Sequence, residues 1–137
     1  MEIKAVVIDV NAYTAFKLGK PGAIEIIKRI PLIVINPVIL GELLCGFVIG
    51  TKEAQNKEEL GLFLKSKRVR IVGIDRNTSI CYSQLYKELK EKGKPIPTND
   101  LWIAATAIQH KCGLFTYDKH FEYISNLKII ANLGDLG

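Results

Sequence analysis

The stretch Ile3-Lys4-Ala5-Val6-Val7-Ile8-Asp9-Val10-Asn11 is an apolar run that ends in a carboxylate and an amide. An apolar run without polar alternation is typical of a strand covered on both faces, as in a parallel sheet between helices. Asp9 follows the end of this strand, where open α/β sheets place their binding crevice, so it is the first candidate site residue. A second interpretation stays open, in which Asp9 only caps a helix that begins near Ala12.

The length and composition indicate one small globular unit. The chain has 137 residues, of which 48% are hydrophobic, enough for one well-filled core. We therefore expect a single domain over 1–137, with a loose tail at about 132–137. The longest apolar stretch, 32–49, is interrupted by a proline, two glycines and Glu42, and the N-terminus lacks a signal-peptide pattern. These features predict a soluble, cytoplasmic protein.

Charge and cysteine usage narrow the function classes. A formal net charge of +5 favours a polyanionic partner, although it can also serve only solubility. Three cysteines, Cys45, Cys81 and Cys112, lie far apart in apolar surroundings, so we expect buried free thiols and neither a disulfide framework nor a zinc site. The two histidines, His110 and His120, are too few and too separated to predict a histidine-rich metal site.

Apolar strands alternate with helical patterns along the rest of the chain. We expect strands at 32–35, 69–74, 114–116 and 127–130, and helices at 12–18, 23–29, 52–65, 77–92, 101–111 and 120–124. Asn36 and Pro37 should start a further helix, Thr98 or Asn99 should cap the helix at 101–111, and Gly113 should close it. Trp102 is expected in the core. The alternation predicts an α/β fold with a mostly parallel central sheet.

Four carboxylates fall where such a fold brings distant residues to one edge. Asp9 and Asp118 follow strands, whereas Glu42 and Asp100 lie in early turns of helices. Each acid also has an ordinary role, as a turn former, a helix-dipole partner or a solvent-facing residue. Together, four carboxylates repel one another unless a cation neutralises them. An oxygen-only set suits one or two Mg²⁺ or Mn²⁺ ions better than zinc or a redox metal.

Four segments of the chain also match a known pattern in order and spacing. They are Ile8-Asp9-Val10-Asn11, Gly41-Glu42-Leu43, Asn99-Asp100-Leu101-Trp102-Ile103-Ala104-Ala105-Thr106-Ala107 and Thr116-Tyr117-Asp118-Lys119-His120-Phe121. This pattern resembles the PIN domain, and most closely the VapC-type toxins of prokaryotic type II toxin-antitoxin pairs. The resemblance spans nearly the whole chain, and its most specific part is the Asn-Asp-Leu-x-Ile-Ala-Ala helix start with the following Thr-x-Asp-x-His-Phe.

The resemblance implies a fold, an activity and partners. The fold is a three-layer α/β/α sandwich, and the activity is a metal-dependent endoribonuclease that cleaves RNA by metal-activated water. Asp9, Glu42, Asp100 and Asp118 would hold the Mg²⁺ or Mn²⁺, with Asn11 and Thr116 as supporting residues. The implied partners are RNA, a small cognate antitoxin and a second copy in a homodimer. At the position after Asp9, where this family usually has a hydroxyl, the chain has Val10, which puts the level of activity in doubt.

Two other functions stay open at this point. A catalytically weak or silent PIN-like module would bind RNA or protein without cutting. A dehalogenase-like phosphoryl-transfer enzyme also opens with a strand and an aspartate, but it needs a second aspartate where Asn11 stands. Basic side chains could guide phosphates, and tyrosines could stack on bases or pack in the core; these are Lys17, Lys20, Arg68, Arg70, Tyr82, Tyr86, Tyr117 and Tyr123.

Overall fold

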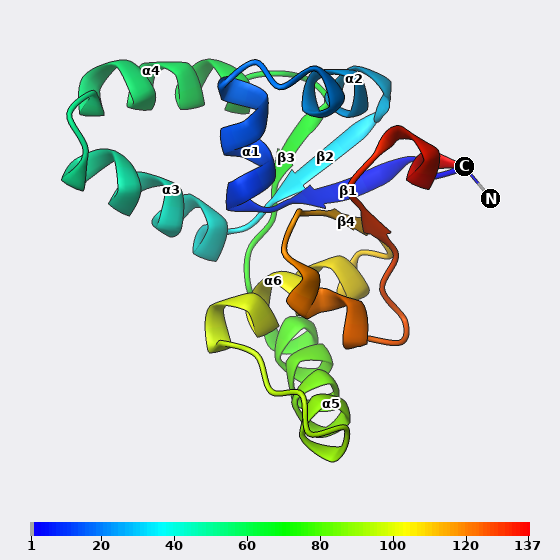
Figure 1. Ribbon diagram of the computed structural model, residues 1–137. Helices are drawn as coiled ribbons and strands as arrows, with labels where there is room; N and C mark the ends of the chain where they lie inside the picture. Colours follow the sequence, from blue (N-terminus) through cyan, green and yellow to red (C-terminus); the bar gives the residue numbers. More distant parts are fainter. Residues whose placement is uncertain (1) are drawn as a thin grey trace.

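A five-stranded parallel sheet forms the centre of the computed structural model, which describes residues 2–137 (Figure 1). The strand order is β3-β2-β1-β4-β5, and every neighbouring pair runs parallel. The strands are β1 (Ala5–Ile8), β2 (Leu32–Ile35), β3 (Val69–Ile71), β4 (Gly113–Phe115) and β5 (Ile129–Ile130). The expected α/β fold with a mostly parallel central sheet is confirmed.

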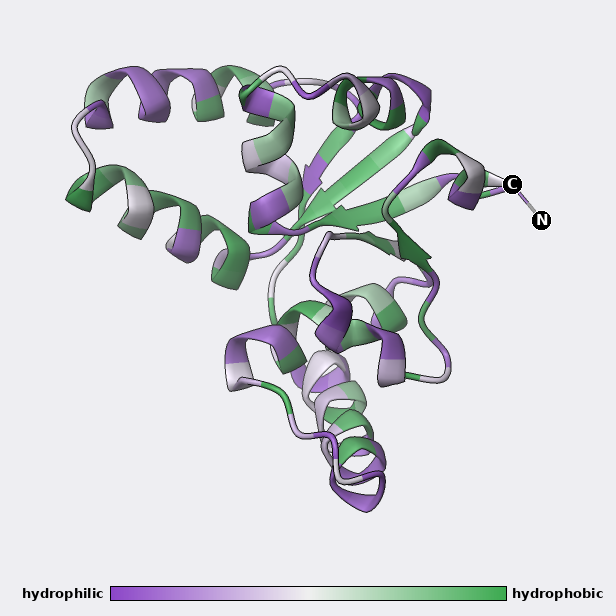
Figure 2. Ribbon diagram, in the orientation of Figure 1, coloured by the Kyte–Doolittle hydropathy of each residue, from purple (hydrophilic) through white to green (hydrophobic). Residues whose placement is uncertain are grey.

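Helices cover the sheet on both sides. They are α1 (Val10–Lys17), α2 (Pro21–Arg29), α3 (Pro37–Ile49), α4 (Glu53–Leu64), α5 (Arg76–Glu91) and α6 (Thr98–Gln109), with short 3-10 helices η1 (Lys119–Tyr123) and η2 (Leu133–Leu136). Figure 1 shows α1 and α2 on one side of the sheet, α5 and α6 on the other, and α3 with α4 as a projecting hairpin. This is the three-layer α/β/α arrangement. Figure 2 shows hydrophobic central strands and a hydrophilic far end of α5.

The core lies where the central strands meet α6 and the first two helices. Val6, Val7 and Ile8 of β1 are completely buried, as are Ile33 and Ile35 of β2. A strand that is buried on both faces cannot alternate polar and apolar residues, which explains its continuous apolar sequence. Trp102 is half-buried and packs against Tyr82 of α5, with ring centroids 4.2 Å apart. Trp102 therefore lies at the contact between α5 and α6.

Several expected boundaries differ from the structure, and three of them have a visible physical reason. Strand β3 ends at Ile71, before the expected 74, and α5 follows with a capping box in which the Asp75 side chain accepts from the N–H of Thr78. Pro97 is the N-cap of α6, which begins directly at Thr98. Gly113 does not close α6 but begins β4, where a Cβ atom would lie 3.3 Å from the carbonyl oxygen of Lys128.

The C-terminal segment also differs from the loose tail that we expected. Residues Leu133–Leu136 form η2, and Asp135 Oδ2 accepts hydrogen bonds from the N–H groups of Ala131 and Asn132. The N–H of Ile3 donates to the carbonyl of Leu136 at 3.1 Å. The two ends of the described chain are thereby held together.

The cysteines and the helices give two further findings. Cys112 is buried, as expected, whereas Cys81 is half-buried and Cys45 is exposed, because Cys45 lies on the projecting helix α3. All three are free thiols.

None of the helices in residues 2–137 combines the length and the apolar character that a membrane span requires.

Candidate metal centre

The register between β1 and β4 places Asp9 beside Thr116. Ile8 pairs with Phe115 in the sheet, so the next residue of each strand comes to the same edge. The N–H of Asp9 donates to the carbonyl of Phe115 at 3.0 Å, and the Thr116 hydroxyl donates to Asp9 Oδ2 at 2.7 Å. Asp9 Oδ1 accepts from the N–H of Val10 at 2.8 Å. Asp9 therefore caps α1 and also lies at the site, which joins the two interpretations of this residue.

The two supporting residues, Asn11 and Thr116, form hydrogen bonds next to Asp9. The Thr116 oxygen accepts from the N–H of Asp118 at 3.0 Å, and the amide Nδ2 of Asn11 lies 3.4 Å from it. Asn11 Oδ1 accepts from the N–H of Tyr117 at 3.0 Å. Because Asn11 and Thr116 bond to the segment that carries Asp118, they fix its position relative to Asp9.

A buried hydrogen-bond network sets the positions of the helices that carry Glu42 and Asp100. Asn36 is completely buried, and its Oδ1 caps α3 by accepting from the N–H of Ile39 at 2.9 Å, as the sequence predicted. Its Nδ2 donates to the Thr106 hydroxyl of α6 at 2.8 Å. This bond ties α3 to α6, and sequence reasoning missed it because Asn36 and Thr106 lie 70 residues apart.

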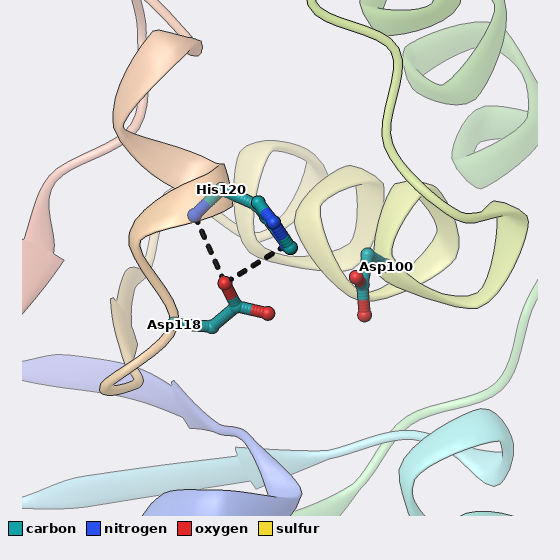
Figure 3. A group of neighbouring side chains, drawn as sticks. All are labelled: Asp100, Asp118 and His120. Carbon is teal, nitrogen blue, oxygen red and sulfur yellow. Dashed lines mark hydrogen bonds and ion pairs between the residues drawn. The ribbon is translucent and has the colours of Figure 1, made fainter.

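Asp118 and His120 approach Asp100 from η1. The carboxylate Oδ1 of Asp118 accepts from the N–H of His120 at 2.9 Å and lies 3.0 Å from His120 Nδ1. One ligand atom each from Asp100, Asp118 and His120 lies within 4.8 Å of the others (Figure 3). We did not predict His120 as a ligand. The sequence feature that could have identified His120 as a ligand is its spacing of two residues from Asp118, which brings both side chains to the same turn.

Burial and mutual repulsion raise the pKa values of Asp9, Glu42 and Asp100. Burial raises the pKa of Asp100 to about 6, and the charges of Asp9, Asp118 and Glu42 add to this effect, whereas His120 opposes it. Burial also raises the pKa of Asp9, against the hydrogen bonds from Thr116 and Val10. Burial and the charge of Asp9 raise the pKa of Glu42, against the side chain of Asn99. The acids therefore lie close enough for each to disfavour ionisation of another.

All four predicted acids line one open cavity of about 480 Å³, which we call the acid cavity. Its other lining residues include Val10, Asn11, Thr14 and Lys20. The remaining basic candidates lie elsewhere: Lys17 pairs with Glu59 at 3.3 Å, and the Arg68 guanidinium donates to the carbonyls of Ile27 and Ile30. Arg70 is exposed on the edge strand β3. Lys20 is thus the one basic residue of the predicted four that the structure places at the acids.

The donor set fits a divalent cation. Glu42 Oε1 is buried and has no hydrogen-bond partner within residues 2–137, which is costly for a carboxylate oxygen. Carboxylate oxygens are the ligands that Mg²⁺ and Mn²⁺ prefer, and imidazole is compatible with Mn²⁺. A cation among these groups would offset the repulsion that adds to the raised pKa values of Asp100 and Glu42. The cluster can therefore bind a metal ion.

Comparisons with known proteins find a matching family model and related sequences. The model of the PIN domain family matches residues 6–127 of the chain. The chain is 34% identical over 105 residues to "Ribonuclease VapC2" of Rickettsia felis, a match that covers 76% of this chain and 77% of that protein. It is 28% identical over 97 residues to "Ribonuclease VapC4" of Mycobacterium tuberculosis, covering 71% of this chain and 75% of that protein.

Solved structures show the same fold. The crystal structure of VapBC2 from Rickettsia felis, bound to a DNA fragment from the promoter, contains a chain that superposes with a TM-score of 0.80 at 28% identity. That match covers 92% of this chain and 97% of the other. DNA-bound VapBC from Salmonella typhimurium superposes with a TM-score of 0.80 at 24% identity, over 93% of this chain and 97% of the other, and is similar in fold.

Proposed function

The chain belongs to the PIN domain family and, within it, to the VapC ribonucleases, and from this membership we propose that it is a Mg²⁺- or Mn²⁺-dependent endoribonuclease and the toxin of a toxin-antitoxin pair. The observation that carries the proposal is the convergence of Asp9, Glu42, Asp100 and Asp118 on one cavity. A second observation supports the metal: Glu42 Oε1 is buried without a partner among residues 2–137. The pKa of Asp100 is raised first by burial and then by the charges of Asp9, Asp118 and Glu42, and a bound cation would offset this second effect.

We assign the ligands and their supports as follows. Asp9 and Asp100 are the principal ligands of one or two ions, and Glu42 and Asp118 complete or orient the site. Asn11 and Thr116 hold Asp9 and the Asp118 segment in place through the hydrogen bonds described above. A bound divalent ion would screen the phosphodiester charge and make an attacking water more acidic. Val10 brings no hydroxyl, but Asp9 still accepts from the backbone N–H of Val10 and from the Thr116 hydroxyl, so its orientation does not depend on a side-chain donor at position 10.

The substrate in this proposal is RNA with an accessible single strand. The acid cavity is open, so a phosphodiester backbone can reach it without unfolding the protein. Lys20 lies at its wall and offers a positive charge to the incoming phosphate. The single-stranded form is favoured because the four acids lie in a concave site that a rigid duplex would reach less easily.

The partners are a cognate antitoxin and a second copy of the chain. Large apolar side chains are exposed on the projecting hairpin of α3 and α4, among them Val48 at 56%, Ile49 at 82% and Leu62 at 63%. Exposed apolar surface of this kind is typical of interaction sites. VapBC2 from Rickettsia felis and VapBC from Salmonella typhimurium were both solved bound to DNA. We extend a partnership between toxin and antitoxin to this chain by analogy.

The decisive experiment is a cleavage assay with matched variants. Purified protein is incubated with tRNA and rRNA fragments in Mg²⁺, in Mn²⁺ or in a chelator. We expect cleavage only with the metals, and a loss of at least about a hundredfold in Asp9→Asn and Asp100→Asn, the scale on which metal-site losses act. Glu91→Gln removes an exposed carboxylate from α5, outside the acid cavity, and should cut like the parent.

The other outcomes separate the alternatives. If Asp9→Asn and Asp100→Asn cut as well as the parent, the proposed site is wrong. If the parent binds RNA but never cuts it in either metal, the silent binding module is the correct function. Co-expression with a small protein encoded directly upstream should yield a complex in which cleavage is suppressed, and the absence of such a complex would remove the toxin assignment.

A further inference from the structure

A second cavity adjoins the acid cavity on the far side of Asp118. It has a volume of about 390 Å³, and we call it the side cavity. The two cavities share the residue Asp118, so a strand that places a phosphate at the acids can place its next nucleotide here. None of the predicted metal ligands other than Asp118 lines it. The side cavity therefore needs an explanation of its own.

Tyr117 gives the side cavity a flat aromatic wall. Its side chain is 42% exposed, while its backbone N–H is fixed by Asn11 Oδ1 at 3.0 Å. The ring also packs edge-on against the buried Phe115, with centroids 5.6 Å apart. A ring that is exposed yet held on two sides is prepared to stack, because little conformational freedom is lost when a base covers it.

The remaining lining residues include apolar, basic and acidic side chains, and Asp135 among them already accepts hydrogen bonds from the N–H groups of Ala131 and Asn132. Ile129 and Ala131 provide a partly apolar wall, and Lys119 provides a positive charge for a phosphate. Glu122 is exposed and has no ion pair or hydrogen bond within residues 2–137, so its carboxylate is free to accept N–H donors. Guanine offers two neighbouring donors on one edge, including the 2-amino group, which suits a carboxylate.

We propose that the side cavity binds the base of the nucleotide next to the scissile phosphate, with Tyr117 as the stacking platform and Glu122 as the group that favours guanine. This inference rests on the proposed ribonuclease function, because it takes the acid cavity as the place of the scissile phosphate. It adds a specificity site outside the metal ligands. Tyr117 thereby acts on base binding, whereas Asp9 and Asp100 act on cleavage.

The test measures binding separately from cleavage. A short fluorescent RNA that contains the mapped cleavage site is titrated with the Asp100→Asn variant, in which we expect binding without cutting. An abasic nucleotide is then moved along the RNA one position at a time. We expect one position beside the cleavage site to weaken binding roughly tenfold, the effect of losing one stacked base.

Matched variants assign that loss to Tyr117. Added to Asp100→Asn, Tyr117→Leu should weaken binding of the intact RNA by a similar factor, and the abasic position should then cost nothing further. Tyr117→Phe keeps the ring and should behave like its parent. Tyr86→Leu removes another exposed tyrosine, which lies on α5 outside both cavities, and should change nothing. Thermal melting checks that each variant is folded.

A third arm examines Glu122. Replacing guanine by hypoxanthine at the sensitive position removes the 2-amino group and should weaken binding, and Glu122→Gln should reduce that difference. Equal binding of the two bases would overturn the role of Glu122.

The outcomes keep this inference apart from the proposed function. The base site is overturned if no abasic position weakens binding, or if the same position weakens binding equally in Tyr117→Leu. Either result overturns it even if the parent cuts RNA normally. A Tyr117-dependent profile with a protein that never cuts overturns the ribonuclease function and leaves the base site standing; the RNA is then the fragment that binds most tightly. A protein that binds no RNA overturns both.

Discussion

The Thr116 hydroxyl donates a 2.7 Å hydrogen bond to Oδ2 of Asp9, although 107 residues separate the two along the chain. The contact follows from the sheet, because Ile8 and Phe115 are paired and each is followed by one of these residues. Asp9 is only 6% exposed, so its ionised form depends on such donors. Thr116 thus helps to keep a buried carboxylate charged.

Replacing Thr116 by valine should affect both stability and activity. Thr116→Val keeps the shape but removes the donor to Asp9 and the acceptor for the Asp118 N–H. We expect a loss of about 1–3 kcal/mol in the free energy of unfolding, measured in urea. The pKa of Asp9 should rise further, so cleavage should begin at a higher pH than in the parent. Thr116→Ser retains the hydroxyl and should lie close to the parent, and identical pH profiles for all three would contradict this role.

Asp100 should destabilise the metal-free protein at neutral pH. Its pKa is raised from 3.8 to about 6, so between these values the folded state binds more protons than the unfolded state. Stability in a chelator should therefore fall as the pH rises from about 4 to about 6 and stay low above it.

The Asp100→Asn variant tests this directly by thermal melting. In a chelator at pH 7.5 it should be more stable than the parent by on the order of 1 kcal/mol, after discounting for solvent screening of a half-buried group. Saturating Mn²⁺ should reverse the order, because only the parent keeps the full ligand set. A variant that is less stable than the parent in both conditions would refute the repulsion on which the metal site is argued.

His120 should influence which metal is preferred. Its imidazole lies beside Asp118 and within 4.8 Å of the other two ligand atoms of the cluster. Imidazole binds Mn²⁺ better than Mg²⁺, which prefers oxygen. His120→Ala should therefore weaken Mn²⁺ binding roughly tenfold and Mg²⁺ binding less, as measured by calorimetry. His110→Ala, at the C-terminal end of α6, is the matched control, and equal losses for both metals would exclude His120 as a ligand.

Lys20 should contribute to RNA binding, whereas Arg68 should contribute to the stability of the fold. Lys20→Ala should weaken RNA binding. It should also reduce the slope of the logarithm of the binding constant against the logarithm of the salt concentration by about 0.7, the contribution of one phosphate contact on a single strand. Arg68→Ala should leave that slope unchanged, because its guanidinium caps the C-terminal carbonyls of α2. We expect Arg68→Ala to cost about 1–3 kcal/mol in unfolding free energy. An unchanged salt slope in Lys20→Ala would remove this lysine from the RNA path.

The sequence by itself determined the features that depend on neighbours along the chain. The apolar run 32–35 coincides with β2, and Asn36 caps α3 as its position before Pro37 predicted, because capping is decided within one helical turn. The alternation of strands and helices predicted the layered fold, and strand ends placed Asp9 and Asp118 at one edge. The positions of Glu42 and Asp100 in early turns of helices predicted the other two acids at the same edge, and the family motifs contain all four.

Tertiary structure alone decided what depends on register and on contacts between distant segments. His120 joins the acid cluster because η1 turns back toward α6, and Arg68 reaches the end of α2 and not the acids. Gly113 belongs to β4, where a Cβ atom would lie only 3.3 Å from the carbonyl oxygen of Lys128, and no local pattern encodes that close approach. The Asn36–Thr106 bond and the side cavity at Tyr117 likewise arise from the packing of elements far apart in sequence. The physical reason is that local preferences specify each element, whereas the pairing of elements is specified by the burial of the whole core.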